Sequence, residues 1–322
     1  MATRTPRRTR PDYARLATEA AHPRSAALEA LSTDELVALL VGEERHAQQA
    51  AYGARREIAR AADRVAAALR AGGRLFYVGA GTSGRLGALD AAELPPTFGS
   101  SPDQVVAVVA GGSRALRRSV EGAEDRPQQA AERLQRLGLD GRDVVCAIAA
   151  SGVTPFARAA LDYAHTRGAA TIFVTCAPDA AKDAGADLVI AAPVGPEILA
   201  GSTRLKGGSA TKMILNALST ATMVALGKVY RGRMVDVVAS NEKLRDRARR
   251  IVVELCRVDE RTARALLKRA GGKVKLAIAM HALGLPAGEA AERLAQSGDD
   301  LHRLFEGGNE RRRAATRKRR RR

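Results

Sequence analysis

The sequence predicts an α/β fold with a doubly wound, five-stranded parallel sheet, followed by a small helical domain. Five short apolar runs alternate with segments that have the spacing of amphipathic helices. Apolar strands separated by helices indicate a parallel sheet with both faces covered. From Glu242 onward, charged residues at helical spacing replace the strands. The expected strands are residues 74–78, 104–109, 143–149, 170–175 and 187–191.

Helices are expected before, between and after these strands. Residues 12–71 have helical periodicity, with Ser32 or Thr33 as an N-cap. The C-terminal segment predicts three short helices, interrupted at residues 271–272 and 284–286. The remaining helices are expected at residues 84–92, 113–121, 154–167 and 209–226.

The composition is that of a globular protein without a membrane segment. Of the 322 residues, 46% are hydrophobic, which is enough for a large core. No apolar run approaches the roughly 20 residues needed to span a bilayer. The N-terminus lacks the apolar stretch of a secretory signal. We therefore expect a cytoplasmic protein.

Cysteine and histidine usage predicts reduced thiols and no metal site. Cys146, Cys176 and Cys256 are odd in number and widely separated, which disfavours a disulfide framework. The five histidines form no i, i+4 pair and no cluster with cysteine. This spacing gives no metal-ligand motif.

The net charge of +18 is concentrated at the two ends of the chain. The last twelve residues carry nine positive charges and the first eleven carry four, which leaves +5 for residues 12–310. Such charge runs favour disordered tails over a charged folded face. The tails are expected to bind polyanions only nonspecifically and in a salt-sensitive way. The interpretation of this chain as a dedicated nucleic-acid-binding protein would depend on these tails alone.

Three loops between strands and helices share glycines and hydroxyl side chains. They are GAGTSG (79–84), ASGVTP (150–155) and GSTRLKGGSATK (201–212). A glycine loop that opens a helix directs unpaired N–H groups at one point and favours an anion there. We therefore expect a phosphate site. Its expected donors are Ser83, Ser151, Thr154, Ser202 and Thr203, with Thr82 and Lys206 as further candidates.

The first loop also matches the G-x-G-x-x-G pattern of dinucleotide-binding folds. That interpretation requires an acid at the end of the second strand to hold the ribose. The second strand is instead followed by Ala110, Gly111 and Gly112, and Asp103 lies before it. The pattern therefore favours a terminal phosphate over a dinucleotide.

Two acids stand out as candidates for proton transfer. Glu93 lies in AELPP, where apolar neighbours and prolines favour a protonated carboxyl group. Glu124 lies beside Asp125 in the more polar segment VEGAEDRP. Two carboxylates of different acidity are the usual equipment of acid/base chemistry at neutral pH. For each residue alone, the more ordinary interpretation is a carboxylate in water, at the end of a helix for Glu93 and beside Asp125 for Glu124.

These motifs resemble the N-acetylmuramic acid 6-phosphate etherases, a family within the sugar isomerase (SIS) superfamily. The resemblance covers roughly residues 16–305 and is carried by VGAGTSGRLGALDAAELPPTFG, VEGAED, ASGVTPFARAALDYA, GSTRLKGGSATKMILNALST and VDVVASNEKLR. The family's usual early Asn-Pro reads His22-Pro23 here, and an Asn expected before a later proline reads Ala177. Neither departure touches Glu93, Glu124 or the first loop.

The resemblance implies an activity and a set of residues. The activity is cleavage of the D-lactyl ether of the sugar with water, giving N-acetylglucosamine 6-phosphate and D-lactate, without a metal or organic cofactor. The family's catalytic acids match Glu93 and Glu124, and a homodimer is implied. The resemblance also divides the chain into an SIS domain at residues 63–232 and a UBA-like domain at 242–306. The other expected segments are a helical region at 12–62 and tails at 1–11 and 307–322.

Two alternatives within the same superfamily remain open at this point. Glucokinase regulatory protein resembles this family and binds phosphosugars without catalysis. A phosphosugar isomerase also needs a base at carbon 2. The presence of both Glu93 and Glu124 favours the etherase over the regulator.

Overall fold

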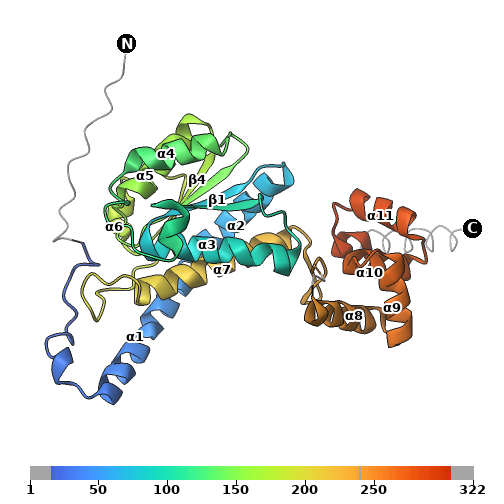
Figure 1. Ribbon diagram of the computed structural model, residues 1–322, viewed down its shortest axis with the longest axis horizontal. Helices are drawn as coiled ribbons and strands as arrows, with labels where there is room; N and C mark the ends of the chain where they lie inside the picture. Colours follow the sequence, from blue (N-terminus) through green and yellow to red (C-terminus); the bar gives the residue numbers. More distant parts are fainter. Residues whose placement is uncertain (1–15, 239–240, 306–322) are drawn as a thin grey trace, which may run out of the picture. The chain divides into compact units, whose positions relative to one another are not determined.

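The computed structural model describes residues 16–238 and 241–305, which form two compact units (Figure 1). The first unit combines the chain up to Ala91 with Asp103–Leu218. The second combines Ala92–Pro102 with the chain from Ser219 onward. The domain boundaries expected from the sequence stay a prediction, and the two charged tails lie outside the described residues.

The first unit contains the predicted five-stranded parallel sheet, in the order β2-β1-β3-β4-β5. Every strand pair is parallel, and Leu75 on β1 lies opposite Val105 on β2 and Val144 on β3. The prediction of the fold class is therefore confirmed, and each strand ends within one residue of its expected bounds. The strands are β1 (Leu75–Gly79), β2 (Val105–Val109), β3 (Val144–Ile148), β4 (Ala170–Thr175) and β5 (Leu188–Ala191).

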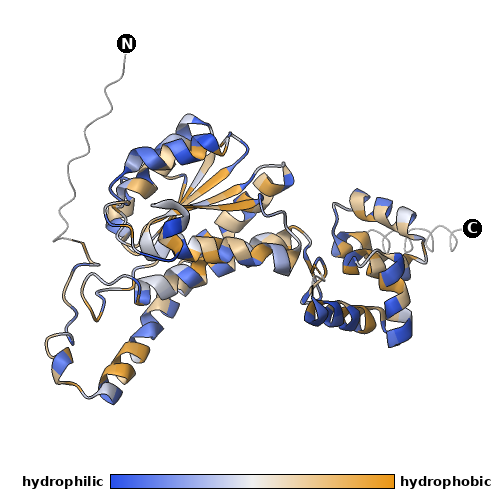
Figure 2. Ribbon diagram, in the orientation of Figure 1, coloured by the Kyte–Doolittle hydropathy of each residue, from blue (hydrophilic) through white to orange (hydrophobic). Residues whose placement is uncertain are grey.

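Helices cover both faces of this sheet, with α4 and α5 on one face and α2, α3 and α7 on the other (Figure 1). The central strands β1 and β3 are buried along their whole length, and the strands of the sheet are predominantly apolar (Figure 2). Successive side chains of a strand point to opposite faces. Phe76 and Val78 accordingly pack with Leu134 on α4 and Phe156 on α5. Tyr77 points to the other face and donates a hydrogen bond to Asp90 on α3. The helices that lie wholly or mainly in this unit are η2 (Leu28–Ala30), α1 (Thr33–Gly53), α2 (Arg55–Arg70), α3 (Gly81–Phe98), η3 (Gly112–Leu116), α4 (Pro127–Arg136), α5 (Pro155–Thr166), α6 (Pro178–Ala181) and α7 (Lys206–Ala225).

Helix α1 begins with a capping box. The Ser32 hydroxyl accepts the N–H of Glu35 at 3.3 Å, and the Glu35 carboxylate accepts the N–H of Ser32 at 2.9 Å. Two N–H groups that would otherwise lack partners are satisfied in this way. The structure therefore selects Ser32 from the two expected N-caps.

Two expected helices differ from those observed. Helix α3 continues to Phe98 and includes Pro95 and Pro96, whereas the sequence predicted its end at residue 92. The prolines lie in its last turn, where they remove only two intrahelical donors. At residues 113–121 the structure has only the short 3-10 helix η3, and the next helix is α4, which the sequence did not predict. Its sequence PQQAAERLQR offers only Leu134 as a large apolar anchor.

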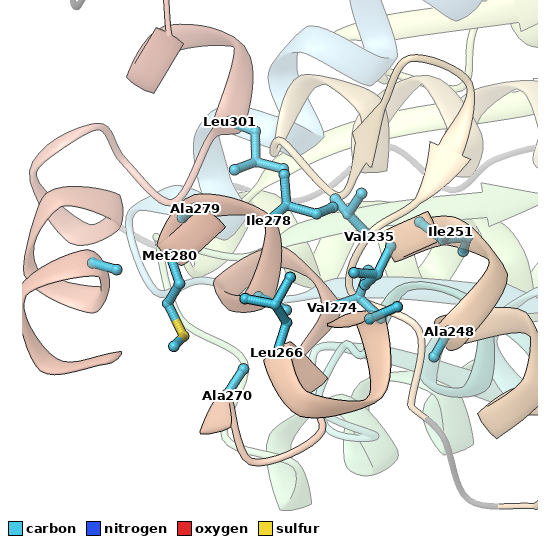
Figure 3. Close-up of a cluster of buried hydrophobic side chains, with 14 of the residues drawn as sticks. Val235, Ala248, Ile251, Leu266, Ala270, Val274, Ile278, Ala279, Met280 and Leu301 are labelled. Atoms are coloured by element: carbon cyan, nitrogen blue, oxygen red, sulfur yellow. The ribbon is translucent and has the colours of Figure 1, made fainter. Parts of the chain in front are cut away.

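Besides the last residues of α3 and α7, the second unit contains a short hairpin and four helices with their own hydrophobic core. The hairpin pairs β6 (Val229–Tyr230) with β7 (Arg233–Met234). Val235 packs in one cluster with Ile251, Leu266 and Ile278 from three different helices (Figure 3). The three short helices expected around residues 271–272 and 284–286 are confirmed. The helices are α8 (Glu242–Cys256), α9 (Glu260–Arg269), α10 (Val274–Leu283) and α11 (Ala287–Gln296).

Within the described ranges, every helix is too short or too polar to cross a membrane. The same residues contain no group of three His, Cys, Asp or Glu side chains placed to hold a metal ion. Cys146, Cys176 and Cys256 are all free thiols. Burial raises the pKa of Cys176 to about 12 and that of Cys256 to about 11.

Candidate active site

The first two hydroxyl loops lie at the carboxyl ends of β1 and β3, which are neighbours in the sheet. In open parallel sheets, ligands bind at this edge. Thr82 and Ser83 lie in the first turn of α3, and both are half-buried. Ser151 is in the loop after β3, and Thr154 is the N-cap of α5 without a side-chain capping bond. The structure therefore places these four hydroxyls where two helices begin.

The glycines of the first loop allow α3 to begin directly against the end of β1. A Cβ atom on Gly84 would lie 2.5 Å from the carbonyl oxygen of Gly79, and one on Gly79 would lie 2.9 Å from the nitrogen of Gly84. Neither position accommodates a side chain. The spacing of these glycines is thus explained by backbone packing, independently of a dinucleotide.

The third loop meets the first at a shared pocket. A Cβ atom on Gly208 would lie 3.5 Å from the Cγ2 atom of Thr82, so the first turns of α3 and α7 lie close together. A pocket of about 510 Å³ opens beside them. It adds two cations that were not among the expected donors, Arg204 and Lys212. The lining residues are Glu44, Gln48, Thr82, Leu86, Arg204, Gly208, Ser209, Lys212 and Met213.

Lys206 is directed away from this pocket. Its side chain is buried, and its Nζ atom lies 2.7 Å from Glu43 Oε2 on α1. Glu43 also lies 3.3 Å from His22 Nε2 and 3.1 Å from His46 Nδ1. Burial acts to raise the pKa of Glu43, but the hydrogen bond and charge of Lys206 outweigh it and the pKa is lowered. The Lys206 ammonium is therefore engaged within the protein.

Buried Glu197 occupies the N-terminus of α7. Its two carboxylate oxygens accept the backbone N–H groups of Lys206 at 3.1 Å and Gly207 at 2.8 Å. Burial raises the pKa of Glu197, against the opposing effect of these two N–H groups. No sequence pattern singled out this residue, because a lone Glu in VGPEILA carries no motif.

Glu124 lies next to the start of α5. Its carbonyl oxygen accepts the N–H of Phe156 at 3.0 Å, which ties its segment to the first turn of that helix. The residue as a whole is exposed. Partial burial of its carboxyl group, followed by the negative charges of Asp125 and Glu121, raises its pKa.

Glu93 lies on α3, ten residues after Ser83, and its side chain is exposed. The sequence predicted an apolar setting, but the neighbouring Leu94 is buried while Glu93 is not. The reason is helical geometry, since consecutive residues of a helix point about 100° apart. Glu93 was expected at the end of the helix and instead lies inside it.

A buried polar network fixes α3 against the sheet. Tyr77 donates its hydroxyl to Asp90 Oδ2 at 3.0 Å, and the Asn216 amide on α7 donates to Asp90 Oδ1 at 2.8 Å. Burial and then the charge of Asp90 raise the pKa of Tyr77. Helix α3 is thereby linked to both β1 and α7, which holds the first and third loops in register.

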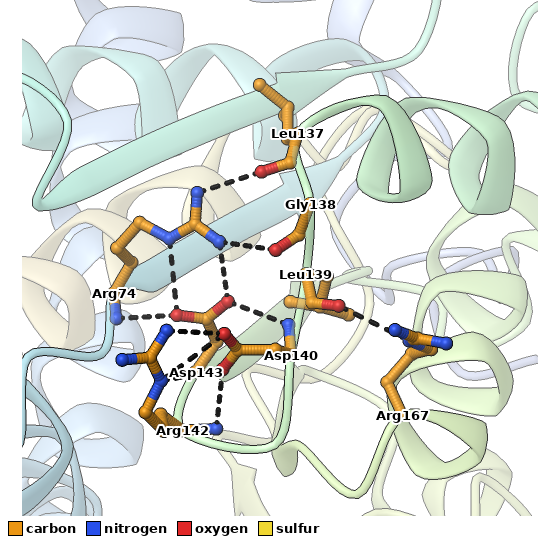
Figure 4. A network of polar contacts seen from close by, with 8 residues as sticks. All are labelled: Arg74, Leu137, Gly138, Leu139, Asp140, Arg142, Asp143 and Arg167. Atoms are coloured by element: carbon orange, nitrogen blue, oxygen red, sulfur yellow. Dashed lines mark hydrogen bonds and ion pairs between the residues drawn. The ribbon is translucent and has the colours of Figure 1, made fainter.

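A second network lies at the amino-terminal ends of β1 and β3, opposite to the hydroxyl loops (Figure 4). The Asp143 carboxylate accepts from Arg74 N at 2.8 Å, Arg74 Nε at 3.2 Å and Arg74 Nη2 at 2.8 Å. Arg74 also donates to the carbonyl oxygens of Leu137 and Gly138, at 2.8 Å each. Because these contacts lie at the strand ends opposite the hydroxyl loops, we expect the network to contribute to stability.

Comparison with known proteins gives extensive matches. A sequence model of the N-terminal SIS domain of glucokinase regulatory protein matches residues 57–165. An N-acetylmuramic acid 6-phosphate etherase of Gloeobacter violaceus is 53% identical over 271 residues, which cover 84% of this chain and 89% of the relative. Those of Parasynechococcus marenigrum and Mycolicibacterium smegmatis are 50% and 48% identical, covering 91% and 90% of this chain and 93% and 97% of the relatives.

Among solved structures, a phosphoheptose isomerase from Neisseria gonorrhoeae matches with a TM-score of 0.47 at 19% identity. The match covers 59% of this chain and 99% of the isomerase. The near-complete coverage at about 50% sequence identity decides the assignment, and this chain belongs to the N-acetylmuramic acid 6-phosphate etherase family.

Proposed function

We propose that this protein cleaves the D-lactyl ether of N-acetylmuramic acid 6-phosphate, with water, to N-acetylglucosamine 6-phosphate and D-lactate. The observation that carries the proposal is the identity of about 50% to etherases over most of the chain. Both proposed acids, Glu93 and Glu124, are present in this sequence.

The proposed reaction needs two proton-transfer groups. An ether oxygen is a poor leaving group, but in the open-chain aldehyde the carbonyl acidifies the hydrogen on carbon 2. We assign Glu124 as the base that removes this proton. We assign Glu93 as the acid that protonates the departing lactate oxygen and then activates the water that adds at carbon 3. Elimination breaks the bond between carbon 3 and the ether oxygen and leaves an alkene between carbons 2 and 3, while lactate departs with that oxygen and one proton. Water then supplies a hydroxyl group to carbon 3 and a proton to carbon 2, which gives the amino sugar.

The 6-phosphate is proposed to bind at the hydroxyl loops. Ser83 and Thr154 lie at the starts of α3 and α5, where N–H groups and the helix dipole favour an anion. Ser151, Ser202, Thr203 and Thr82 complete the proposed set. Binding of a remote phosphate holds the reacting carbons in place and can supply several kcal/mol toward the barrier.

Ser83→Ala is expected to weaken substrate and inorganic phosphate binding about tenfold or more, since a hydrogen bond to a charged group contributes about 1.5–3 kcal/mol. KM and the inhibition constant of inorganic phosphate measure this effect. Thr166→Ala, at the far end of α5, serves as the control and should leave both constants unchanged. Unchanged phosphate affinity in both Ser83→Ala and Ser151→Ala would remove these loops from the site.

Asp125→Asn is expected to shift the acidic limb of kcat/KM to lower pH. The Asp125 charge helps to raise the pKa of Glu124 above its ordinary 4.5, and only the ionised Glu124 acts as the proposed base. As pH falls through this raised pKa, activity is lost; removing the neighbouring charge lowers the pKa and delays that loss. A pH profile of each protein tests this, and an acidic limb that stays in place contradicts the assignment of Glu124 as base.

A lactate assay separates the proposal from its alternatives. Purified protein incubated with N-acetylmuramic acid 6-phosphate should release D-lactate, and the unphosphorylated sugar should not be cleaved. A phosphosugar isomerase would instead form a ketose phosphate, and a phosphosugar-binding regulator would bind without turnover. Binding without lactate would support the regulator, whose SIS domain model matches residues 57–165.

A homodimer in the cytoplasm completes the proposal. In its support, α1 exposes Val37 and Val41, which are 51% and 67% exposed and lie one turn apart. Apolar side chains grouped on a helix face favour association. Sedimentation equilibrium would measure the mass. Polyanion binding by the tails concerns residues outside those described and stays a prediction.

A further inference from the structure

Helices α5 and α7, which follow two of the hydroxyl loops, differ at their N-termini. The first N–H groups of an α-helix have no partner within it and attract anions. At α7, both oxygens of Glu197 already accept the N–H groups of Lys206 and Gly207, and the residue is 1% exposed. At α5, the Thr154 side chain makes no capping bond. The α7 N-terminus is thus closed by the protein's own carboxylate.

The Glu197 carboxylate also closes the loop that precedes α7. Glu197 stands immediately before residues 198–205, and its two partners stand immediately after them. The loop is held at its base by one side chain, which reduces the conformational freedom of the residues between. Ser202 and Thr203 lie within it and are only half-buried. We call this arrangement, Glu197 with the N–H groups of Lys206 and Gly207, the Glu197 clasp.

The clasp is anchored to α1 through the Lys206 side chain. Lys206 is 3% exposed, and its ammonium pairs with Glu43, which is 5% exposed, at 2.7 Å. A buried charge without a partner is strongly destabilising, so this pair fixes where the start of α7 sits. Gly207 lies directly against the carboxylate, since a Cβ atom there would be in van der Waals contact with Glu197 Oε1 at 3.4 Å.

We propose that Glu197 is a positioning residue that holds residues 198–205 so that Ser202 and Thr203 face the substrate phosphate. This inference rests on the proposed phosphate site. Glu197 does not act as a proton donor or acceptor toward substrate, because both of its oxygens are engaged and it is shielded from solvent. The proposed proton transfers remain assigned to Glu93 and Glu124.

Glu197→Gln tests the clasp with little change of volume. Glutamine offers one oxygen and one NH₂ group, so one of the two backbone N–H groups faces another donor. We expect KM and the inorganic phosphate inhibition constant to rise together by about tenfold, with kcat within twofold of the wild type. A purely structural role would instead lower the fraction of active protein and leave KM unchanged. Glu132→Gln, an exposed glutamate on α4, is the matched control.

A double-mutant cycle gives a second readout. If Glu197 acts through Ser202, then Ser202→Ala added to Glu197→Gln weakens phosphate binding little further. Additive losses contradict the proposal. Should Glu197→Gln fail to fold, Glu197→Asp keeps the charge, shortens the reach by one methylene and enters the same cycle.

Inorganic phosphate separates failure of the clasp from failure of the proposed function. Unchanged KM and phosphate inhibition in an active, folded Glu197→Gln would overturn the clasp and leave the etherase intact. If the wild type released no lactate, thermal stabilisation by phosphate would still be compared between wild type and variant. Loss of that stabilisation in the variant would support the clasp on its own.

Discussion

Glu93→Gln is expected to abolish release of D-lactate while hydrogen on carbon 2 still exchanges with deuterated solvent. The amide does not protonate the departing lactate oxygen, whereas the proposed base Glu124 remains in place. Glu124→Gln is expected to lose both exchange and lactate release, because removal of the carbon 2 proton comes first. Loss of one acid/base group typically costs about 10²–10⁴-fold in rate. NMR follows the exchange, and a coupled assay follows the lactate.

The control for both variants is Glu132→Gln, which changes an exposed glutamate on α4 and should retain full activity. Exchange that survives in Glu124→Gln and vanishes in Glu93→Gln would reverse the two roles. The raised pKa of Glu124 makes this comparison informative, since it brings that carboxyl group closer to the acidity of an acid catalyst. Full activity in both variants would exclude the two-carboxylate mechanism.

Asp143→Ala is expected to lower the free energy of unfolding by about 3 kcal/mol, the lower end of the range for breaking a buried ion pair. Asp143 is 2% exposed and accepts three hydrogen bonds from Arg74 and one from the N–H of Asp140. Arg74 keeps its bonds to two carbonyl oxygens and partial access to water, which limits the loss. Urea denaturation measures the change.

The matched control is Asp140→Ala in the same turn. Arg142 holds the pKa of Asp140 at about 2 through hydrogen bonds, but both side chains are solvent-exposed. Water and salt screen such a pair, so its removal should barely move the denaturation midpoint. A loss at Asp143 no larger than that at Asp140 would show that the contacts between Asp143 and Arg74 in Figure 4 contribute little to stability.

The sheet was predictable because its signal is local. Strands that are buried on both faces are continuous apolar runs, so β1 and β3 are easily distinguished from the more polar residues that flank them. The Ser32 cap was predictable for the same reason, since its partner Glu35 is three residues away. Helix α4 was missed because its sequence is polar apart from Leu134, and packing against α5 stabilises it.

The features of the candidate site that the sequence did not predict depend on contacts between segments that are distant in the chain. Lys206 has the sequence context of a phosphate ligand, but Glu43, 163 positions away, determines where its ammonium lies. Glu197 acquires its position only when residues 198–205 fold back onto α7. The exposure of Glu93 follows from the continuation of α3 through Pro95 and Pro96, which local rules argue against.

Isotope tracing is the most direct test of elimination followed by addition of water. N-acetylmuramic acid 6-phosphate is cleaved in water enriched in ¹⁸O and deuterium, and both products are examined by mass spectrometry and NMR. Elimination followed by addition of water places ¹⁸O on carbon 3 and deuterium on carbon 2 of the amino sugar, and lactate retains the original ether oxygen. Appearance of ¹⁸O at the lactate hydroxyl, or release of lactate with no deuterium on carbon 2, would contradict it.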